Sequence, residues 1–350
     1  MVGIEPASMT AVFCQNATDR KAETWKTLLD PFGVLEFAVS DGARGIAKAV
    51  ADVAVARRDD PSSAALEHGL DVFHTTREAR RVLARIWRRG EAKWELGETA
   101  DAKVAAAKRQ CLDARGVAQA ARAAWSQAVA SYVQAERLES AWERAHAALD
   151  LFTADGRLND RAGAESEIAA AVSDLPGPDW SKVRNALNDP RSLAFLDRMH
   201  RRLETAEPRR DRREALAWRW WLRHRRPRPS DPLADLVRAV GRDCALSVEE
   251  RASYDRISAV LRDTFRASSA VECMNSVLRM QQSRHRRMTQ PMLDLKRLYW
   301  NCHRFRCGPR KDASPYQSLS LELPTYDFWE LLHTDPKSLT QQLSTSGIAE

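Results

Sequence analysis

The chain of 350 residues is long enough for two or more domains. Its 55 Lys and Arg exceed its 48 Asp and Glu, and the formal charge of +7 favours an acidic partner such as nucleic acid. The six cysteines are scattered without a Cys-x-x-Cys pair, which argues against a secreted disulfide scaffold. No stretch approaches the roughly 18 apolar residues that span a bilayer, and residues 1–10 lack the apolar core of a signal peptide. We therefore expect a soluble, cytoplasmic protein with no membrane partner.

The first 75 residues alternate short β-prone runs with helical patterns. Strands are expected near 2–4, 9–13, 34–39 and 70–74, and helices over 24–29 and 43–55. Strands that alternate with helices predict an α/β unit with a mixed or largely parallel sheet.

From residue 76 the composition becomes rich in Ala, Arg, Glu and Trp, and 76–150 contains no proline. Trp87 and Trp94 are seven residues apart, as are Trp125 and Tyr132, so aromatic rings recur on one helical face. We expect a helical hairpin that turns near Gly116. Further helices are expected over 160–173, 179–188, 191–206, 210–224, from 233, and over 248–265. The predicted parts are 1–75, 76–260 and 261–350.

A polar face is expected on a helix that contains residues 266–279. Glu272, Asn275 and Arg279 share that face by i, i+3, i+7 spacing, while Met274 and Leu278 share an apolar one with Val271. Ser269 and Glu272 also fit a capping box, in which each side chain satisfies the other's backbone N–H. On spacing alone, Glu272 is either a functional carboxylate or a cap.

Candidate polar residues also follow the predicted strands of the first part. Asp41 and Gly42 come directly after 34–39, at the strand end where ligand sites of α/β sheets gather. An Asx turn or a helix N-cap is the structural alternative for Asp41, since Asp-Gly before a helix is ordinary turn chemistry. Asp71 and His74 fall on the predicted strand 70–74 and, three apart, should face opposite sides of it. A sheet-edge Asp and a hydrogen-bonded His are the structural alternative.

In chain order, Ser-Asp41-Gly, Asp71-Val-Phe-His74 and Glu272-Cys-Met-Asn275 resemble the core of bacterial insertion-sequence transposases. These are DDE enzymes of the RNase H-like fold, and the pattern is also similar to the hAT and Mutator-like groups. The closing segments resemble the end of the family's core, over 298–305, 314–316 and 328–332. The resemblance implies an α/β RNase H-like core with a large all-α insertion, in a chain that is predominantly helical overall.

The resemblance also implies a chemistry. Such enzymes cleave and join strands of double-stranded DNA by in-line attack, with two divalent cations, Mg²⁺ or Mn²⁺, on the attacking and leaving oxygens. Asp41 and Glu272 would be catalytic metal ligands, since Mg²⁺ is held by carboxylates and phosphates. Asp71, His74 and Asn275 would support them. A homo-oligomer acting on the bacterial nucleoid, with no small-molecule substrate, is implied as well.

The sequence departs from the family at one position. The family's first catalytic Asp lies on an earlier strand, and neither Glu5 nor Asp19 matches it. We therefore expect an incomplete core that lacks the first strand and is inactive alone. A truncated or decayed element, or a misplaced start codon, would explain such a core. The alternatives are a non-catalytic remnant or domesticated DNA-binding or oligomerising protein, and a helical scaffold in which Glu272 is a cap.

Basic segments, one of them interleaved with aromatic residues, are candidates for DNA contact. Structural alternatives are a buried helix face formed by Trp218, Trp221 and Leu222, which we favour for these tryptophans, and basic residues that merely aid solubility. The expected nucleic-acid-binding residues are Trp220, Arg223, Arg225, Arg226, Arg279, Arg284, Arg286, Arg287, Arg304, Arg306, Arg310 and Lys311.

Overall fold

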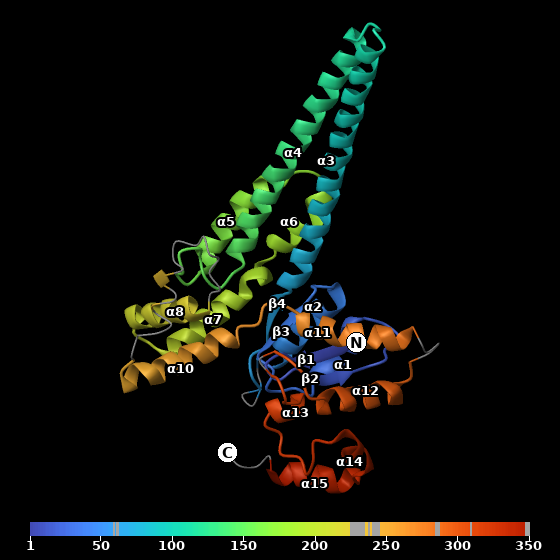
Figure 1. Ribbon diagram of the computed structural model, residues 1–350. Helices are drawn as coiled ribbons and strands as arrows, with labels where there is room; N and C mark the ends of the chain where they lie inside the picture. Colours follow the sequence, from blue (N-terminus) through green and yellow to red (C-terminus); the bar gives the residue numbers. More distant parts are fainter. Residues whose placement is uncertain are drawn as a thin grey trace. The chain divides into compact units, whose positions relative to one another are not determined.

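The computed structural model describes residues 1–58, 60, 63–224, 235–236, 239, 246–283, 288–308 and 310–346. The chain divides into two compact units. Unit 1 comprises 1–68 and 267–350, and unit 2 comprises 69–266. The described part is predominantly helical with a small amount of strand, as expected from the sequence (Figure 1).

Unit 1 contains short strands in two pairs. β1 (Val2–Glu5) and β2 (Thr10–Cys14) are antiparallel, and β3 (Phe37–Ser40) pairs with β4 (Glu67–Leu70), whose last two residues lie past the unit boundary. Among the described residues, the strands therefore form two two-stranded sheets and not the single mixed sheet that we expected. The prediction of a strand over 70–74 is wrong, because β4 ends at Leu70.

Each pair of strands has its own hydrophobic cluster. Next to β3, the helices α1 (Ala22–Leu29) and α2 (Arg44–Ala56) bury Leu29, Val50 and Val53. The β1–β2 pair packs instead against helices from the other end of the chain, α11 (Ser269–Gln282) and α12 (Gln290–Cys302). The residues of this second cluster are Ala11, Cys14, Met274, Leu278 and Leu293. The expected burial of Met274 and Leu278 on one helix face is thus confirmed.

Helix α12 also binds the backbone of β2 through side chains. The amide of Asn301 is buried and pairs with Ala11, accepting its N–H at 2.8 Å and donating to its carbonyl at 3.1 Å. Arg297 donates to the carbonyl of Val12, and the indole of Trp300 donates to that of Met9. The first and last parts of the chain are therefore joined by backbone-directed hydrogen bonds as well as by apolar contact.

The chain closes with short helices: α13 (Pro315–Ser318), α14 (Phe328–His333) and α15 (Pro336–Ser346). Ser314 and Gln317 form a capping box at α13, and the Asp327 carboxylate accepts two backbone N–H groups at α14. These side chains satisfy donors that the first helical turn leaves unpaired.

Unit 2 is built on the predicted helical hairpin. α3 (Val72–Arg109) and α4 (Arg115–Ala148) lie side by side and turn at 110–114, two residues before the expected Gly116 (Figure 1). Rings meet between them edge-on, with Trp94 and Trp125 centroids 4.7 Å apart. Gly97 lies under Trp125, where a Cβ would stand 3.0 Å from the indole. A small residue on one helix therefore makes room for a large ring on the other.

Shorter helices complete unit 2 close to the expected ranges. They are α5 (Arg161–Ser173), η1 (Pro178–Trp180), α6 (Ser181–Leu187), η2 (Pro190–Leu193), α7 (Ala194–Ala206), α8 (Arg210–His224) and α10 (Val248–Arg262). Most of the helix expected from 233 lies outside the described residues.

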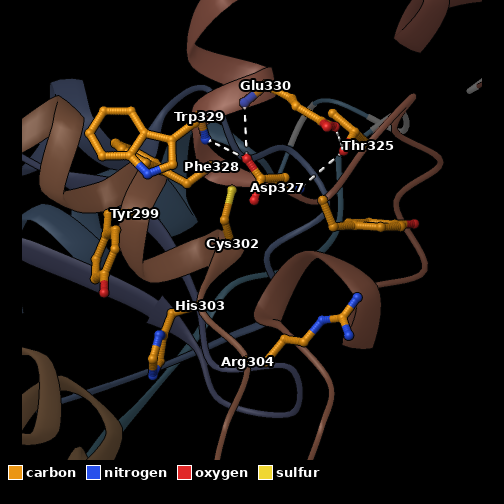
Figure 2. Close-up of a pocket in the computed structure, with 10 residues that line it drawn as sticks. Tyr299, Cys302, His303, Arg304, Thr325, Asp327, Phe328, Trp329 and Glu330 are labelled. Carbon is orange, nitrogen blue, oxygen red and sulfur yellow. Dashed lines mark hydrogen bonds between the residues drawn. The ribbon is translucent and has the colours of Figure 1, made fainter.

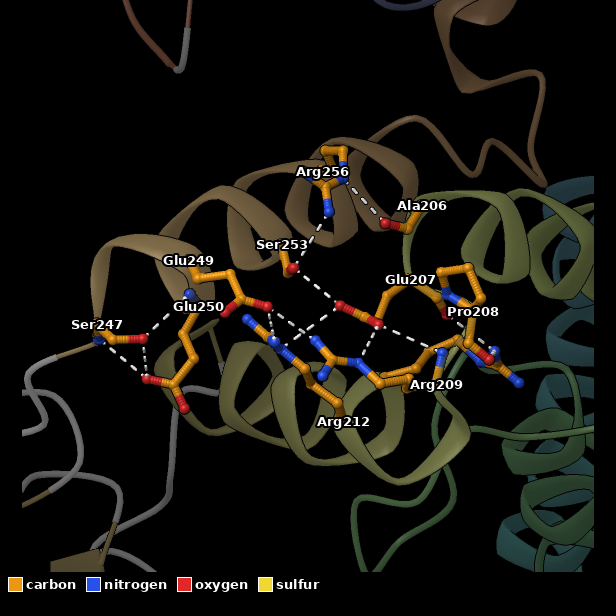
Figure 3. Close-up of polar contacts among 11 residues, drawn as sticks. Ala206, Glu207, Pro208, Arg209, Arg212, Ser247, Glu249, Glu250, Ser253 and Arg256 are labelled. Atoms are coloured by element: carbon orange, nitrogen blue, oxygen red, sulfur yellow. Dashed lines mark hydrogen bonds and ion pairs between the residues drawn. The ribbon is translucent and has the colours of Figure 1, made fainter.

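A polar network joins α7, α8 and α10 (Figure 3). Glu207, which is 3% exposed, accepts a hydrogen bond from Ser253 at 2.8 Å and pairs with Arg209 at 3.3 Å. Arg209 and Arg212 also share Glu249, at 2.9 and 2.5 Å. The pKa of Glu207 lies below its ordinary value, chiefly because the Ser253 hydroxyl donates to the ionised carboxylate. The buried carboxylate of Glu207 thus has a hydrogen-bond donor and a positively charged partner. Because these groups come from different helices, the network fixes how the three helices meet.

Candidate functional site

Asp41 directly follows β3, as the sequence predicted. Its Oδ1 accepts the N–H of Ala43 at 3.1 Å across Gly42, which has a positive φ of 72°. This is the Asx turn that we kept as an alternative, and it precedes the start of α2. The preceding Ser40 is buried and lies 2.8 Å from the His68 ring. An exposed carboxylate is thus held at a strand end, with one oxygen bonded to backbone.

Glu272 lies in the first turn of α11. Its carboxylate is 20% exposed and lies 3.6 Å from the guanidinium of Arg279. The shared face expected for these two residues is confirmed by this contact. The helix begins at Ser269, so this serine is its first helical residue and not the preceding cap that the proposed box requires. Asn275, on the same face one turn further, is half-buried.

Asp71 and His74 are not on a strand. Asp71 is the N-cap of α3, where its carboxylate accepts the N–H of Phe73 at 2.8 Å and bonds to the ring of His74. The two side chains therefore meet, three residues apart on a helical turn, and do not face opposite sides of a sheet. So short an apolar run does not distinguish a strand from a helix start, whereas an Asp before it is a capping signal. Both residues belong to unit 2, whereas Asp41, Glu272 and Asn275 belong to unit 1.

Two carboxylates of unit 1 supply oxygen ligands of the kind that a metal pair needs. Asp41 and Glu272 supply hard oxygen donors, the type that Mg²⁺ and Mn²⁺ take. Among the described residues, however, no group of three or more His, Cys, Asp or Glu side chains is arranged to hold a metal ion.

The expected DNA contacts differ in their surroundings. Arg304, Arg306 and Lys311 are exposed on the turn after α12. Arg310 is half-buried and donates to the backbone carbonyls of Ala7 and Pro6 at 2.6 and 2.7 Å, so it ties this turn to the start of the chain. Five further candidates lie outside the described residues: Arg225, Arg226, Arg284, Arg286 and Arg287.

The aromatic segment of α8 is packed differently from the expected pattern. Trp220 stacks on Phe152, with centroids 5.9 Å apart and planes at 14°, and on His224 at 4.2 Å. Rings of the protein therefore occupy positions that a stacked base would need. Leu222 is buried as expected, but Trp218 remains 38% exposed. Arg223 is exposed and lies over the ring of Tyr254.

Sequence reasoning passed over a pocket of about 550 Å³ in unit 1 (Figure 2). Tyr299 and Trp329 line it and are 51% and 65% exposed, and Arg304 lies at its lower edge. Cys302 faces it, and burial, with the Asp327 charge adding to it, raises the pKa of this thiol to about 11. The aromatic spacing in 299–305 was visible in the sequence, but 325–330, the segment opposite, is brought there by tertiary structure.

Six arginines on α3, between Arg77 and Arg89, were also passed over. Their i, i+4 spacing was the available signal.

No family model, curated protein or solved structure matches this chain. Among the residues that the structure describes, no helix is both long and apolar enough to cross a bilayer. We therefore infer the function from the residues and their geometry.

Proposed function

We propose that this chain is the core of a DDE-type DNA transposase, an RNase H-like core into which a helical domain is inserted. One observation carries the proposal. Asp41 at the end of β3 and Glu272 in the first turn of α11 belong to one compact unit, although all of unit 2 separates them in sequence. A helical insertion between the second carboxylate and the glutamate helix is the arrangement that the family resemblance implies.

The strand pairs are compatible with this proposal. In an RNase H-like sheet, the strand that carries the first catalytic Asp lies between an antiparallel pair and the next strand along the chain. Without that strand, the sheet would leave two separate pairs, as in β1–β2 and β3–β4. The order of β1, β2, α1, β3, α2 and β4 also agrees with such a core.

Two carboxylates are too few for the chemistry. The divalent cations that such enzymes use would stabilise the attacking and leaving oxygens, and Asp41 and Glu272 would hold them. Since the described residues supply no third ligand near such a pair, we assign no catalytic step to this polypeptide. We expect it to bind double-stranded DNA, as an oligomer on paired DNA ends, without cutting it.

A different observation favours a second function. The chain would then be a DNA-binding or oligomerising protein of the same origin, without a metal site. The Asp41 carboxylate supports a backbone turn, and Glu272 pairs with Arg279. Both carboxylates therefore have structural uses that need no metal ion.

Titration with Mn²⁺, followed by electron paramagnetic resonance, separates the two functions. If both carboxylates hold the ion, Asp41→Asn and Glu272→Gln each weaken Mn²⁺ binding, and the double variant is little worse than either single one. Asp52→Asn is the matched control, because Asp52 is a partly exposed carboxylate of the same unit that pairs with Lys48 at 3.4 Å. Equal Mn²⁺ binding by wild type and all variants would reject the metal site and leave the second function.

A further inference from the structure

The first part of α3 carries an unusual concentration of positive charge. Between positions 77 and 89 there are six arginines and a single acidic residue, Glu78. Four of the arginines follow each other at i, i+4 along the helix. We call these six residues the arginine ladder: Arg77, Arg80, Arg81, Arg85, Arg88 and Arg89.

The ladder lies opposite the buried face of the helix. Ala79, Val82 and Leu83 are buried in unit 2, while Arg80 and Arg88 are exposed and the side chain of Arg81 is 62% exposed. These arginines therefore do not serve the packing of α3 against its neighbours.

Two acidic side chains pair with three of the ladder arginines. Glu78 lies 3.5 Å from Arg81, and Asp179 is shared between Arg85 at 3.7 Å and Arg89 at 3.4 Å. All three ladder side chains in these pairs are at least 47% exposed, and surface pairs of this kind contribute little. Like charges at i, i+4 also destabilise a helix by about 0.2 to 0.5 kcal/mol per pair. Helix stability alone would not favour such a sequence.

A hollow of about 300 Å³ lies at the start of the ladder. Arg77, Arg80 and Arg81 line it together with Phe73 and Thr76. The guanidinium of Arg77 lies 5.8 Å from the centroid of the Phe73 ring, which helps to fix its position. Three arginines of the ladder thus border one hollow, and arginine binds a phosphate group through paired N–H donors.

We propose that the arginine ladder is a binding surface for the phosphate backbone of double-stranded DNA. Twelve residues of helix rise span about 18 Å, which matches about five base pairs of duplex and exceeds what one free phosphate needs. The choice of DNA as the polyanion rests on the proposed function, whereas the surface itself follows from charge and spacing.

The test is binding of a duplex oligonucleotide to the full chain in metal-free buffer, measured by fluorescence anisotropy over a range of salt. Its variant is Arg80→Gln/Arg81→Gln/Arg88→Gln. Lys103→Gln/Lys108→Gln/Arg109→Gln is the matched control, since it removes three exposed cations from the far end of the same helix. Circular dichroism checks that both variants keep their helices.

We expect the ladder variant to reduce the slope of log K against log salt by about 2.7, that is about 0.9 for each lost phosphate contact. Its affinity near 0.1 M salt should fall by roughly two orders of magnitude, while the control stays close to wild type. Equal losses in both triple variants, or none in either, would overturn the ladder as a specific surface. Ladder-dependent binding to phosphatidylserine vesicles, with DNA binding unchanged, would overturn it in favour of a lipid surface.

The outcomes also separate this inference from the proposed function. If wild type binds no duplex, both fail. If the ladder variant alone loses DNA binding while Mn²⁺ binding is insensitive to Asp41→Asn and Glu272→Gln, the ladder stands and the metal site fails.

Discussion

Replacing Asn301 by Ala should open the contact between the two ends of the chain in unit 1. Both Asn301 and its partner Ala11 are buried, 1% and 2% exposed, and the substitution removes both hydrogen bonds between them. The N–H and C=O of Ala11 would be left without these partners, and each unsatisfied buried group costs about 1 to 3 kcal/mol. We therefore expect a local loss of about 2 to 6 kcal/mol.

Hydrogen exchange of the β2 amides, measured by mass spectrometry, reports this loss locally. A loss of 2 kcal/mol corresponds to exchange about 30-fold faster, because each 1.4 kcal/mol is tenfold. Asn16→Ala is the matched control: Asn16 also reaches the loop before α12, donating to the carbonyl of Met288 at 3.0 Å, but it is exposed and should cost less than about 1 kcal/mol. Exchange in the Asn301 variant within about threefold of wild type would refute the reasoning.

A second substitution tests the mechanism. Asn301→Asp keeps an acceptor for the Ala11 N–H but, when ionised, has no donor for the Ala11 carbonyl. Burial raises the pKa of such a carboxyl, so protonation below about pH 5 should restore the donor and part of the protection. Recovery on raising the pH would contradict this account.

Two further predictions concern unit 2. Gly90→Ala should stabilise it by about 0.5 to 1 kcal/mol, because the new Cβ would meet the Tyr132 ring at 3.5 Å, an ordinary contact, and glycine is unfavourable within a helix. Gly97→Ala should stabilise unit 2 less than Gly90→Ala or destabilise it, because its Cβ would stand 3.0 Å from the indole of Trp125. A rise in melting temperature equal to or larger than that of Gly90→Ala would contradict this packing. Burial is the main cause that lowers the pKa of His146 in the folded protein. As pH falls, the unfolded chain therefore binds a proton at this histidine before the folded chain does. The free energy of unfolding of unit 2 should thus decrease as pH falls through about 6.5. His146→Gln should flatten that part of a denaturant series measured against pH, and an unchanged slope would show that other groups cause it.

Much of the secondary structure was predictable because its signals are local. The hairpin of α3 and α4 follows from a long proline-free segment with rings seven residues apart, and its turn lies within a few residues of the predicted one. The strand expected at 70–74 failed for an equally local reason. An N-cap Asp before a short apolar run begins a helix, and strand propensity over so few residues is weak evidence.

The packing partners of these elements were harder to predict from the sequence. The apolar face with Met274 and Leu278 was evident from spacing, but its burial against Ala11 and Cys14 depends on residues more than 250 positions away. Likewise, the stacking of Trp220 between protein rings was not visible in a segment whose composition suited DNA equally well. Spacing tells which side chains share a face, and it does not tell what that face meets.

Asp41 and Glu272 show the same division between local and tertiary information. By itself, the sequence determined that one carboxylate follows a strand, that another begins a late helix with Arg279 on its face, and that a helical segment separates them. Tertiary structure alone decided that both belong to one unit, and that Asp71 and His74 belong to the other. The physical reason is that turns and helix faces are set by neighbours along the chain, whereas a compact unit is set by the burial of apolar surface between distant segments.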